Sequence, residues 1–294
     1  MTYLIDASIF IFRAWFSVPD SMTCPNDHPV NAVYGYTRFL SDFLESVQPD
    51  SVAAAFDESQ TDSFRREIFP AYKANRDPAP DELKRQFEQC RTVTRLLGIT
   101  ECSNRRFEAD DLIGTMAGRA RESGSCVSIL SRDKDLLQIL QAGDVMWDFV
   151  GDRRIAHDDV PELFGVRADQ IVDYLALAGD SVDNIPGAPG VGAKTASALL
   201  QHFDSLDEIF VNLDSVENVN VRGAAKLGAK LEAHRELVYM CRELTRIRYD
   251  APLPDSDRIL TREAPDLDQL NSLYDDVGFG SSLRRQAQRI ADSY

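Results

Sequence analysis

The chain has 294 residues, 44% of them hydrophobic, which is enough for one large domain or two smaller ones. Its formal net charge of −16 argues against generic nucleic-acid binding, which usually relies on an excess of Lys and Arg. Five cysteines without a CxxC pair, and the lack of an apolar run of about eighteen residues, indicate a reduced cytoplasmic protein that neither crosses a membrane nor binds zinc.

Short apolar runs alternate with helical patterns over residues 1–157. Strands are predicted at 3–6, 52–56, 126–131 and 145–149. Helices are predicted where apolar residues recur every three or four positions, at 33–47, 83–97, 110–121 and 136–140. This alternation predicts an α/β domain built on a doubly wound, mostly parallel sheet.

The strand pattern fades after residue 157, and helical patterns continue to residue 246, including one at 171–178. We therefore expect a second, smaller helical domain over 158–250. The remaining extension, 251–294, has weaker patterns. It is expected to pack back on the sheet, with a helix at 267–273 and a returning segment at 279–285.

A glycine-rich turn at 187–194 lies between two helical patterns. Glycines before a helix N-terminus suit a phosphate, because open backbone N–H groups and the helix dipole both favour an anion. Ala193 stands where a P-loop requires Gly, and Thr195 where a dinucleotide fingerprint requires its third Gly, so both motifs are excluded. Taken alone, the turn leaves open a tight helix–helix connection without a ligand.

Carboxylates stand at the ends of three predicted strands and at the start of one helix. Because ligands bind beyond the carboxyl ends of parallel strands, these side chains are expected to converge. Glu108 and Asp111 are three apart and can share a helical face, whereas Asp110 is expected to point elsewhere unless the turn is irregular. With two acids before the glycine turn, the set has nine members: Asp6, Asp57, Glu108, Asp110, Asp111, Asp133, Asp135, Asp180 and Asp183.

Each acid alone is more readily explained as a helix cap or a solvated turn. Acids that converge need another explanation, because two carboxylates about 4 Å apart repel by roughly 4 kcal/mol at an effective dielectric constant of about 20. Converging acids need cations or raised pKa values, and oxygen ligands without His or Cys favour Mg²⁺ or Mn²⁺. The number of acids predicts two ions and in-line displacement at a phosphodiester. Neutralising the nine acids still leaves a net charge of −7, so nucleic-acid binding is expected to depend on local basic patches and to weaken with salt.

A basic stretch, 63–80, interleaves cations with aromatic residues between a strand and a helix. Lys73 and Arg76 are three apart, and we expect them to share a helical turn and to reach over the acids to a scissile phosphate. Cations are needed there because the acids alone would repel a phosphodiester. Composition leaves open a plain surface helix whose aromatic residues dock on the core.

Seven motifs follow one another in a fixed order: LIDAS (4–8), VYGY (33–36), AFDE (55–58), FRR…YKANR (64–76), FEADD (107–111), SRDKDLLQIL (131–140) and GDSVDNIPGAPGVGAKTA (179–196). As a set they resemble the 5′ nuclease (flap endonuclease) superfamily, most of all the 5′→3′ exonuclease domain of bacterial DNA polymerase I and its stand-alone relatives. The resemblance covers nearly all of residues 1–210. It implies a PIN-like nuclease domain with a basic helical arch near 62–82 and a helix–hairpin–helix at 184–203.

The resemblance also implies roles for particular residues. The nine acids would hold two Mg²⁺ or Mn²⁺ ions, directly or through water, and K⁺ would bind at the hairpin. Lys73 and Arg76 would be the catalytic cations that engage the scissile phosphate. The implied DNA contacts are Tyr36, Arg65, Gly187, Gly190, Val191, Gly192, Lys194 and Thr195.

The implied activity is cleavage of DNA near 5′ ends, flaps or RNA primers by a free-standing enzyme. Two alternatives stay open: a catalytically silent DNA-junction-binding protein whose acids only stabilise the fold, and an RNase of related fold. A haloacid-type phosphatase is excluded, because Asp6 is followed by Ala7 and Ser8 and lacks a second Asp two residues on.

Overall fold

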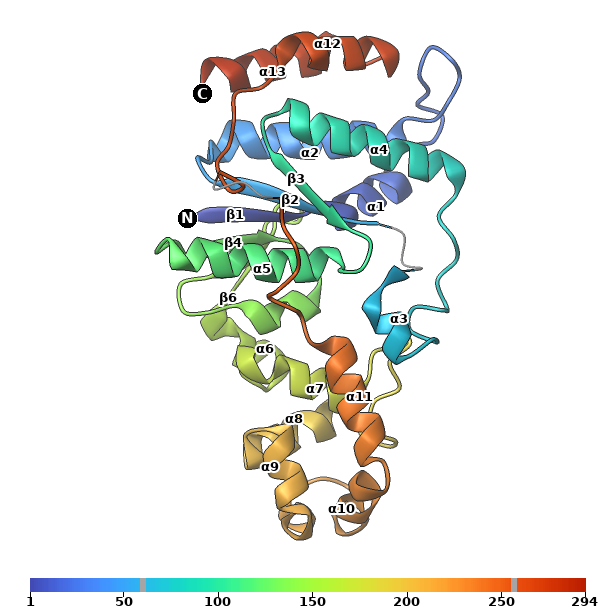
Figure 1. Ribbon diagram of the computed structural model, residues 1–294, viewed down its shortest axis with the longest axis vertical. Helices are drawn as coiled ribbons and strands as arrows, with labels where there is room; N and C mark the ends of the chain where they lie inside the picture. The colour runs from blue at the N-terminus through green and yellow to red at the C-terminus, as the bar shows by residue number, and fades with distance from the viewer. Residues whose placement is uncertain (59–61, 255–257) are drawn as a thin grey trace.

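The computed structural model describes residues 1–58, 62–254 and 258–294 (Figure 1). Within the predicted first domain, residues 59–61 lie outside the described residues. Within the predicted extension, residues 255–257 do so as well. The predicted α/β architecture with a smaller helical domain is confirmed.

A six-stranded sheet with the order β3-β2-β1-β4-β5-β6 forms the centre of the first domain. Its strands are β1 (Thr2–Asp6), β2 (Val52–Asp57), β3 (Thr100–Asn104), β4 (Val127–Leu130), β5 (Val145–Asp148) and β6 (Arg153–Ala156). The first five run parallel, and β6 is antiparallel to β5. The sequence did not predict β3 and β6, because the strands TECSN and RRIA are polar and lack the apolar run of a central strand.

Helices cover both faces of the sheet (Figure 1). One face carries α1 (Ala7–Ser17), α2 (Asn31–Val47) and α4 (Asp81–Leu96), and the other carries α5 (Ala109–Glu122) and the 3₁₀ helix η2 (Lys134–Ile139). Successive strand residues point to opposite faces, so Leu4 enters the core beneath α5 whereas Ile5 enters the core beneath α2. The burial of both faces explains why the central strands are continuously apolar.

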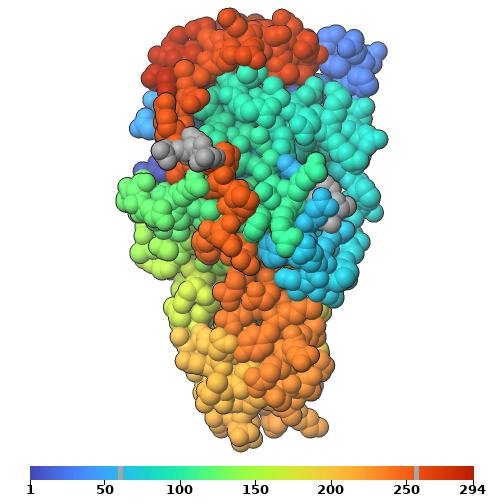
Figure 2. Space-filling view, viewed as in Figure 1, coloured from blue at the N-terminus to red at the C-terminus, as the bar shows by residue number. Residues whose placement is uncertain are grey.

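The second domain consists of short helices and forms the narrower end of the molecule (Figures 1 and 2). Its α-helices are α6 (Val160–Phe164), α7 (Ile171–Ala178), α8 (Ala193–Phe203), α9 (Leu206–Val211), α10 (Ala224–Ala233) and α11 (Arg235–Thr245), with 3₁₀ turns η3 (His157–Asp159), η4 (Ala168–Gln170) and η5 (Leu213–Asn218). Their apolar residues share one continuous core with the α5 face of the sheet. Of the helices in the described part of the chain, none combines the length and apolar character that crossing a bilayer requires.

The C-terminal extension returns along the first domain. The Leu260 carbonyl accepts the N–H of Val52 at the start of β2, and α12 (Leu267–Asp276) confirms the predicted helix. The predicted return of 279–285 to the sheet is wrong, because α13 (Ser281–Asp292) begins there. Its apolar residues recur at helical spacing, and α13 packs on α2, so this part of the extension covers the helical layer rather than the sheet.

Candidate active site

Acidic side chains meet at the switch point of the sheet, where β1 lies between β2 and β4. Asp6 ends β1, and its Oδ2 accepts a hydrogen bond from Oγ of Ser131, just after β4, at 2.8 Å. Asp57 ends β2, and its Oδ1 accepts the N–H of Ala109 at the start of α5, at 2.9 Å. Two carboxylates are thus fixed at the carboxyl edge of the sheet, as the sequence predicted.

Burial and repulsion raise the pKa values of two acids at this edge of the sheet. Burial, followed by repulsion from Asp57 and Asp133, raises the pKa of Asp6 to about 7. Burial, followed by repulsion from Asp133, Asp6 and Asp57, raises the pKa of Asp110 well above its usual range. Asp110 therefore belongs to this group of acids, which is the outcome expected if the turn before α5 is irregular.

The start of α5 explains this outcome. Glu108 is the N-cap and has an extended backbone, with φ −84° and ψ 167°, so the helical spacing rule does not apply between it and Asp111. Asp111 instead turns back, and its Oδ2 accepts the N–H of Glu108 at 3.0 Å, as in a capping box. The Asp111 side chain is fully buried and paired with Arg65, so the structure contradicts its predicted role as a metal ligand.

A second group of acids gathers around η2. Asp133 caps η2, and its Oδ1 accepts the N–H of Asp135 at 3.0 Å. Burial and repulsion from Asp183 raise the pKa of Asp133, and burial and repulsion from Asp133, Asp183 and Asp180 raise that of Asp135. Lys134 approaches Asp180 at 2.7 Å, and this pair lowers the pKa of Asp180 despite the opposing effect of burial. The acids before the glycine turn therefore lie beside those after β4.

The arch segment, which we define as residues 63–76, differs from its predicted conformation. Only α3 (Phe64–Ile68) is helical, and it ends before Pro70, which disfavours helix at the preceding residue. Lys73 has a φ of 52°, and its N–H donates to the Asp183 carbonyl at 2.9 Å. The prediction that Lys73 and Arg76 share one helical turn is therefore wrong, although both side chains do reach the acids.

Lys73, Arg76 and Tyr72 connect the arch segment to both groups of acids. Lys73 Nζ lies 2.8 Å from Glu108 Oε2 and 3.6 Å from Asp183 Oδ2, and Arg76 pairs with Asp183. The Tyr72 hydroxyl donates to Glu108 at 3.1 Å and to Asp183 at 3.2 Å. The sequence analysis missed Tyr72, and the signal that could have revealed it is its position directly before Lys73.

Electrostatics set the charge states of this contact. Burial favours neutral Glu108, but the cations Lys73 and Arg65 outweigh it and lower the pKa of Glu108 to about 2. Burial also favours neutral Lys73, but Glu108 and Asp183 outweigh it and raise the pKa of Lys73 well above its usual range. Both groups are therefore charged at neutral pH.

The donor atoms fit divalent cations. Glu108 Oε1 and Asp135 Oδ1 are buried without a hydrogen-bond partner among the described residues, and the neighbouring acids repel one another. Carboxylate oxygens of this kind suit a hard ion. Across residues 1–58, 62–254 and 258–294, no three acidic, His or Cys side chains already surround one point. Ion pairs with Lys73, Lys134 and Arg76 engage three of the predicted ligands instead.

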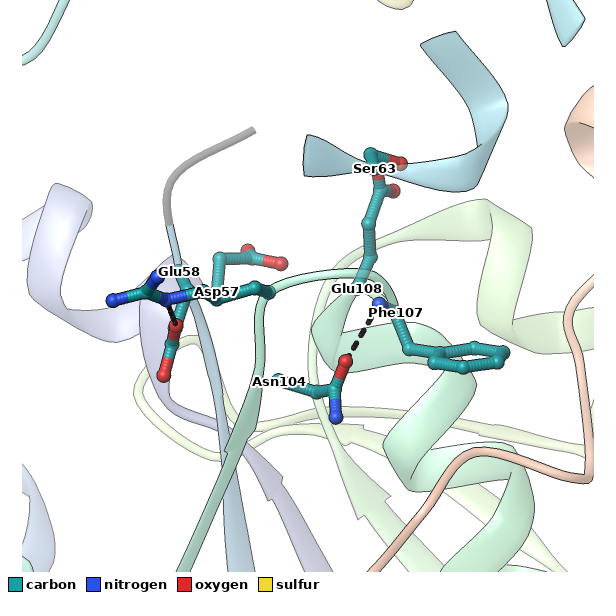
Figure 3. A pocket seen from close by; sticks show the side chains of 7 residues that line it. Asp57, Glu58, Ser63, Asn104, Phe107 and Glu108 are labelled. Carbon is teal, nitrogen blue, oxygen red and sulfur yellow. Dashed lines mark hydrogen bonds and ion pairs between the residues drawn. The ribbon is translucent and has the colours of Figure 1, made fainter. Parts of the chain in front are cut away.

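A small pocket lies beside Asp57 and Glu108, between the arch segment and the loop that joins β3 to α5 (Figure 3). Ser63 lines it from the arch side. On the loop side, Asn104 Oδ1 accepts the N–H of Phe107 at 3.1 Å and so holds the loop in shape. The pocket thus brings solvent-accessible space next to two of the predicted metal ligands.

The structure contradicts direct DNA contact for four predicted residues. Tyr36 is fully buried in α2, where its hydroxyl bonds Thr94 at 2.9 Å, and the Arg65 side chain is 3% exposed. Gly187 and Val191 are buried within the hairpin. The shared cause is packing against neighbouring elements, which a motif does not reveal.

The remaining hairpin residues form an accessible turn between α7 and α8. Gly190, Gly192 and Lys194 are exposed, and Thr195 is partly exposed. Gly190 has a φ of 78°, which favours glycine, and Gly192 caps α8. The first N–H groups of a helix lack partners within it, so this turn presents donors together with a lysine. The predicted bounds of the helix–hairpin–helix, 184–203, contain α8 alone, and the helix before the turn is α7, which ends at Ala178.

Comparison with known proteins agrees with this architecture. The 5′–3′ exonuclease N-terminal resolvase-like domain matches residues 1–165, and the 5′–3′ exonuclease C-terminal SAM fold matches residues 166–268. A bacteriophage T5 flap endonuclease, crystallised with DNA and metal ions, is similar with a TM-score of 0.68 and 21% identity, covering 99% of this chain and 98% of that one. At that identity the likeness concerns the fold.

Curated relatives are closer in sequence. The chain is 34% identical over 293 residues to DNA polymerase I of Rhizobium leguminosarum, covering 97% of this chain and 28% of that protein. It is 36% identical over 295 residues to DNA polymerase I of Pseudomonas aeruginosa, covering 99% of this chain and 32% of that protein. The chain spans less than a third of the length of these relatives. Both halves of the chain match the same family, and the chain therefore belongs to the 5′–3′ exonuclease family.

Proposed function

We propose that the chain is a structure-specific 5′ nuclease that hydrolyses DNA phosphodiesters near 5′ ends or flaps with two Mg²⁺ or Mn²⁺ ions. The observation that carries this proposal is the meeting of two mutually repelling groups of acids beneath Lys73 and Arg76 of the arch segment. A site that combines acids for cations with cations for a phosphate is suited to phosphodiester hydrolysis. Family membership supports the same reaction.

The two groups of acids would hold one ion each, directly or through water. The first group comprises Asp6, Asp57, Glu108 and Asp110, and the second comprises Asp133, Asp135, Asp180 and Asp183. Divalent ions supply an activated water and stabilise the leaving oxygen in such sites. Asp111 is left out of both groups, because its oxygens are already engaged.

Lys73 and Arg76 would bind the scissile phosphate. In the structure they pair with Glu108 and Asp183, so a bound cation that takes over these carboxylates would free both side chains for the substrate. The raised pKa of Lys73 keeps it a cation, which suits phosphate binding and excludes a role as a general base near neutral pH.

The turn from Gly190 to Lys194 would hold the backbone of the duplex, with K⁺ as a possible further ligand of the hairpin. Its exposed glycines and the start of α8 support this role. DNA with 5′ ends, flaps or RNA primers would be the substrate. The similarity to a flap endonuclease that was crystallised with DNA and metal ions supports DNA as the partner.

Cleavage of 5′-labelled flap duplexes, with Mg²⁺ or with EDTA, tests this proposal. The expected result is Mg²⁺-dependent release of a short 5′ product from a DNA arm. Binding of the flap without cleavage would instead indicate a junction-binding protein. Cleavage restricted to an RNA 5′ arm would indicate an RNase of related fold.

A further inference from the structure

Arg65 and Asp111 form a buried ion pair that none of the proposed substrate or metal contacts uses. Arg65 Nη1 lies 2.7 Å from Asp111 Oδ2, and Nη2 lies 2.8 Å from Oδ1. The two side chains are 3% and 0% exposed. This bidentate geometry is the strong form of an arginine–carboxylate contact, and burial shields it from water.

The pair connects three segments that are distant in sequence. Arg65 belongs to α3 in the arch segment, and Asp111 belongs to the first turn of α5. Arg65 Nε donates to the Leu244 carbonyl at 2.8 Å, and Nη2 donates to the Arg246 carbonyl at 3.0 Å. Asp111 Oδ1 accepts the N–H of Arg248 at 2.8 Å. The third segment is therefore the end of α11, the last helix of the helical domain, with the residues that follow it.

The same pair reaches the candidate active site through one residue. Asp111 Oδ2 accepts the N–H of Glu108 at 3.0 Å, and the Glu108 carboxylate in turn accepts from Lys73. The two Asp111 oxygens thus receive four hydrogen bonds, two from Arg65 and two from backbone N–H groups. Four donors fill the acceptor capacity of a carboxylate, so Asp111 has no lone pair left for a metal ion.

We infer that Arg65 and Asp111 are positioning residues that lock the arch segment and the end of α11 to the N-terminus of α5. These contacts fix Glu108 beneath Lys73. They also link the position of the end of α11 to the geometry of the acids. The inference rests on the proposed nuclease function for its consequence in catalysis. A displacement of about 1 Å in such a site can lower a rate roughly a hundredfold, so loss of the lock affects the chemical step more than binding.

Two variants separate positioning from ligation. Asp111→Asn removes the charge, and Arg65→Lys keeps the charge but loses the bidentate contact and hydrogen bonds to carbonyls. Asp110→Asn serves as the reference for a lost ligand. Measurements are the single-turnover cleavage rate, the Mg²⁺ concentration for half-maximal rate, the flap affinity in Ca²⁺, and amide hydrogen exchange over residues 63–76.

We expect Asp111→Asn and Arg65→Lys to lower the single-turnover rate roughly tenfold to a hundredfold. The flap affinity should stay within about twofold of wild type, because both side chains are buried. The half-maximal Mg²⁺ concentration should rise less than in Asp110→Asn, because the pair positions Glu108 without offering a free oxygen to the ion. Residues 63–76 should exchange faster in both variants. Asp110→Asn should instead raise the Mg²⁺ requirement.

A rise in the Mg²⁺ requirement of Asp111→Asn as large as that of Asp110→Asn would overturn the inference, as would wild-type rates in both variants. If Asp111→Asn does not fold, the cleavage rate, Mg²⁺ requirement and hydrogen exchange of Arg65→Lys test the inference instead. If wild type proves not to be a nuclease, the exchange of residues 63–76 still tests the lock, and unchanged exchange in both variants rejects it.

Discussion

The ammonium group of Lys73 lies 2.8 Å from Oε2 of Glu108, with both side chains about 10% exposed. A cation of the arch segment and a candidate metal ligand therefore neutralise each other inside the protein. An exchange of partners follows from this contact: a metal ion that takes the carboxylate leaves Lys73 available for a phosphate. In the structure, Lys73, which we propose binds the scissile phosphate, therefore pairs with a proposed metal ligand.

Lys73→Met should destabilise the fold, because it leaves the Glu108 carboxylate buried without its nearest partner. Breaking a buried ion pair from one side costs about 3 kcal/mol or more. Urea unfolding in EDTA should show a loss of this size. The matched control is Lys84→Met, since Lys84 pairs with Asp81 on the exposed surface, where water screens the contact, so its loss should barely change the free energy of unfolding. Equal effects of the two variants would contradict the buried pair.

The stability of the metal-free protein should fall between about pH 4 and pH 7. The pKa of Asp6 is about 7 in the folded protein against 3.8 for the free side chain, so over this range the folded state holds a proton that the unfolded state has lost. The stabilisation is fully present below the unfolded pKa and is lost as pH rises through the folded pKa.

Urea unfolding at pH 5 and pH 8 in EDTA measures this effect, with Asp6→Asn as the comparison. Asp6→Asn should reduce the decline, because it removes one of the acids with a raised pKa together with its repulsion of Asp110. Mg²⁺ should also flatten it, because the bound ion favours the ionised acids and releases their protons. A decline that Asp6→Asn leaves unchanged would assign the effect to other groups.

Two glycines of the hairpin should respond differently to alanine. Gly187 has a φ of 67°, and a Cβ there would lie only 2.4 Å from the backbone nitrogen of Gly179. Gly187→Ala should therefore lower the stability by more than about 1 kcal/mol. Around Gly192 a Cβ would meet nothing within 4 Å, so Gly192→Ala should fold as wild type does.

Duplex affinity then tests the phosphate-binding role of the turn. If a DNA backbone approaches Gly192 closely, Gly192→Ala should weaken binding while its melting temperature is unchanged. Wild-type affinity in a stable Gly192→Ala protein would show that this glycine does not face the duplex.

Sequence patterns predicted the features that depend on chain order and spacing. Strand-end acids such as Asp6 and Asp57 converge because parallel strands share a carboxyl edge. Apolar residues that recur every two positions in strands, or about every 3.6 in helices, predicted most elements. The patterns missed α1, β3 and β6, whose residues do not show these periods clearly. The sequence also placed Lys73 over the acids but gave it the wrong backbone conformation, because Pro70 disfavours helix at Phe69 and α3 ends at Ile68.

What the sequence could not supply is the side-chain environment. Asp110 and Asp111 are adjacent acids, yet one faces the repelling group and the other is enclosed by Arg65 and backbone N–H groups. The difference arises because Glu108 caps α5 from outside the helix, which depends on three-dimensional packing. Tyr36 and Arg65 were misassigned as DNA contacts for the same reason, since a motif does not state which of its residues are buried.

The most direct test of the proposed nuclease site is single-turnover cleavage of a 5′-labelled flap by wild type, Asp133→Asn and Asp214→Asn, with flap binding measured in Ca²⁺. Asp133 belongs to the second group of acids and repels Asp6 and Asp110 of the first. Asp214 is an exposed acid of η5 and serves as the matched control. The account predicts Mg²⁺-dependent release of a short 5′ product by wild type and Asp214→Asn, and a loss of at least about a hundredfold in Asp133→Asn with binding retained. Equal cleavage by all three proteins would contradict it.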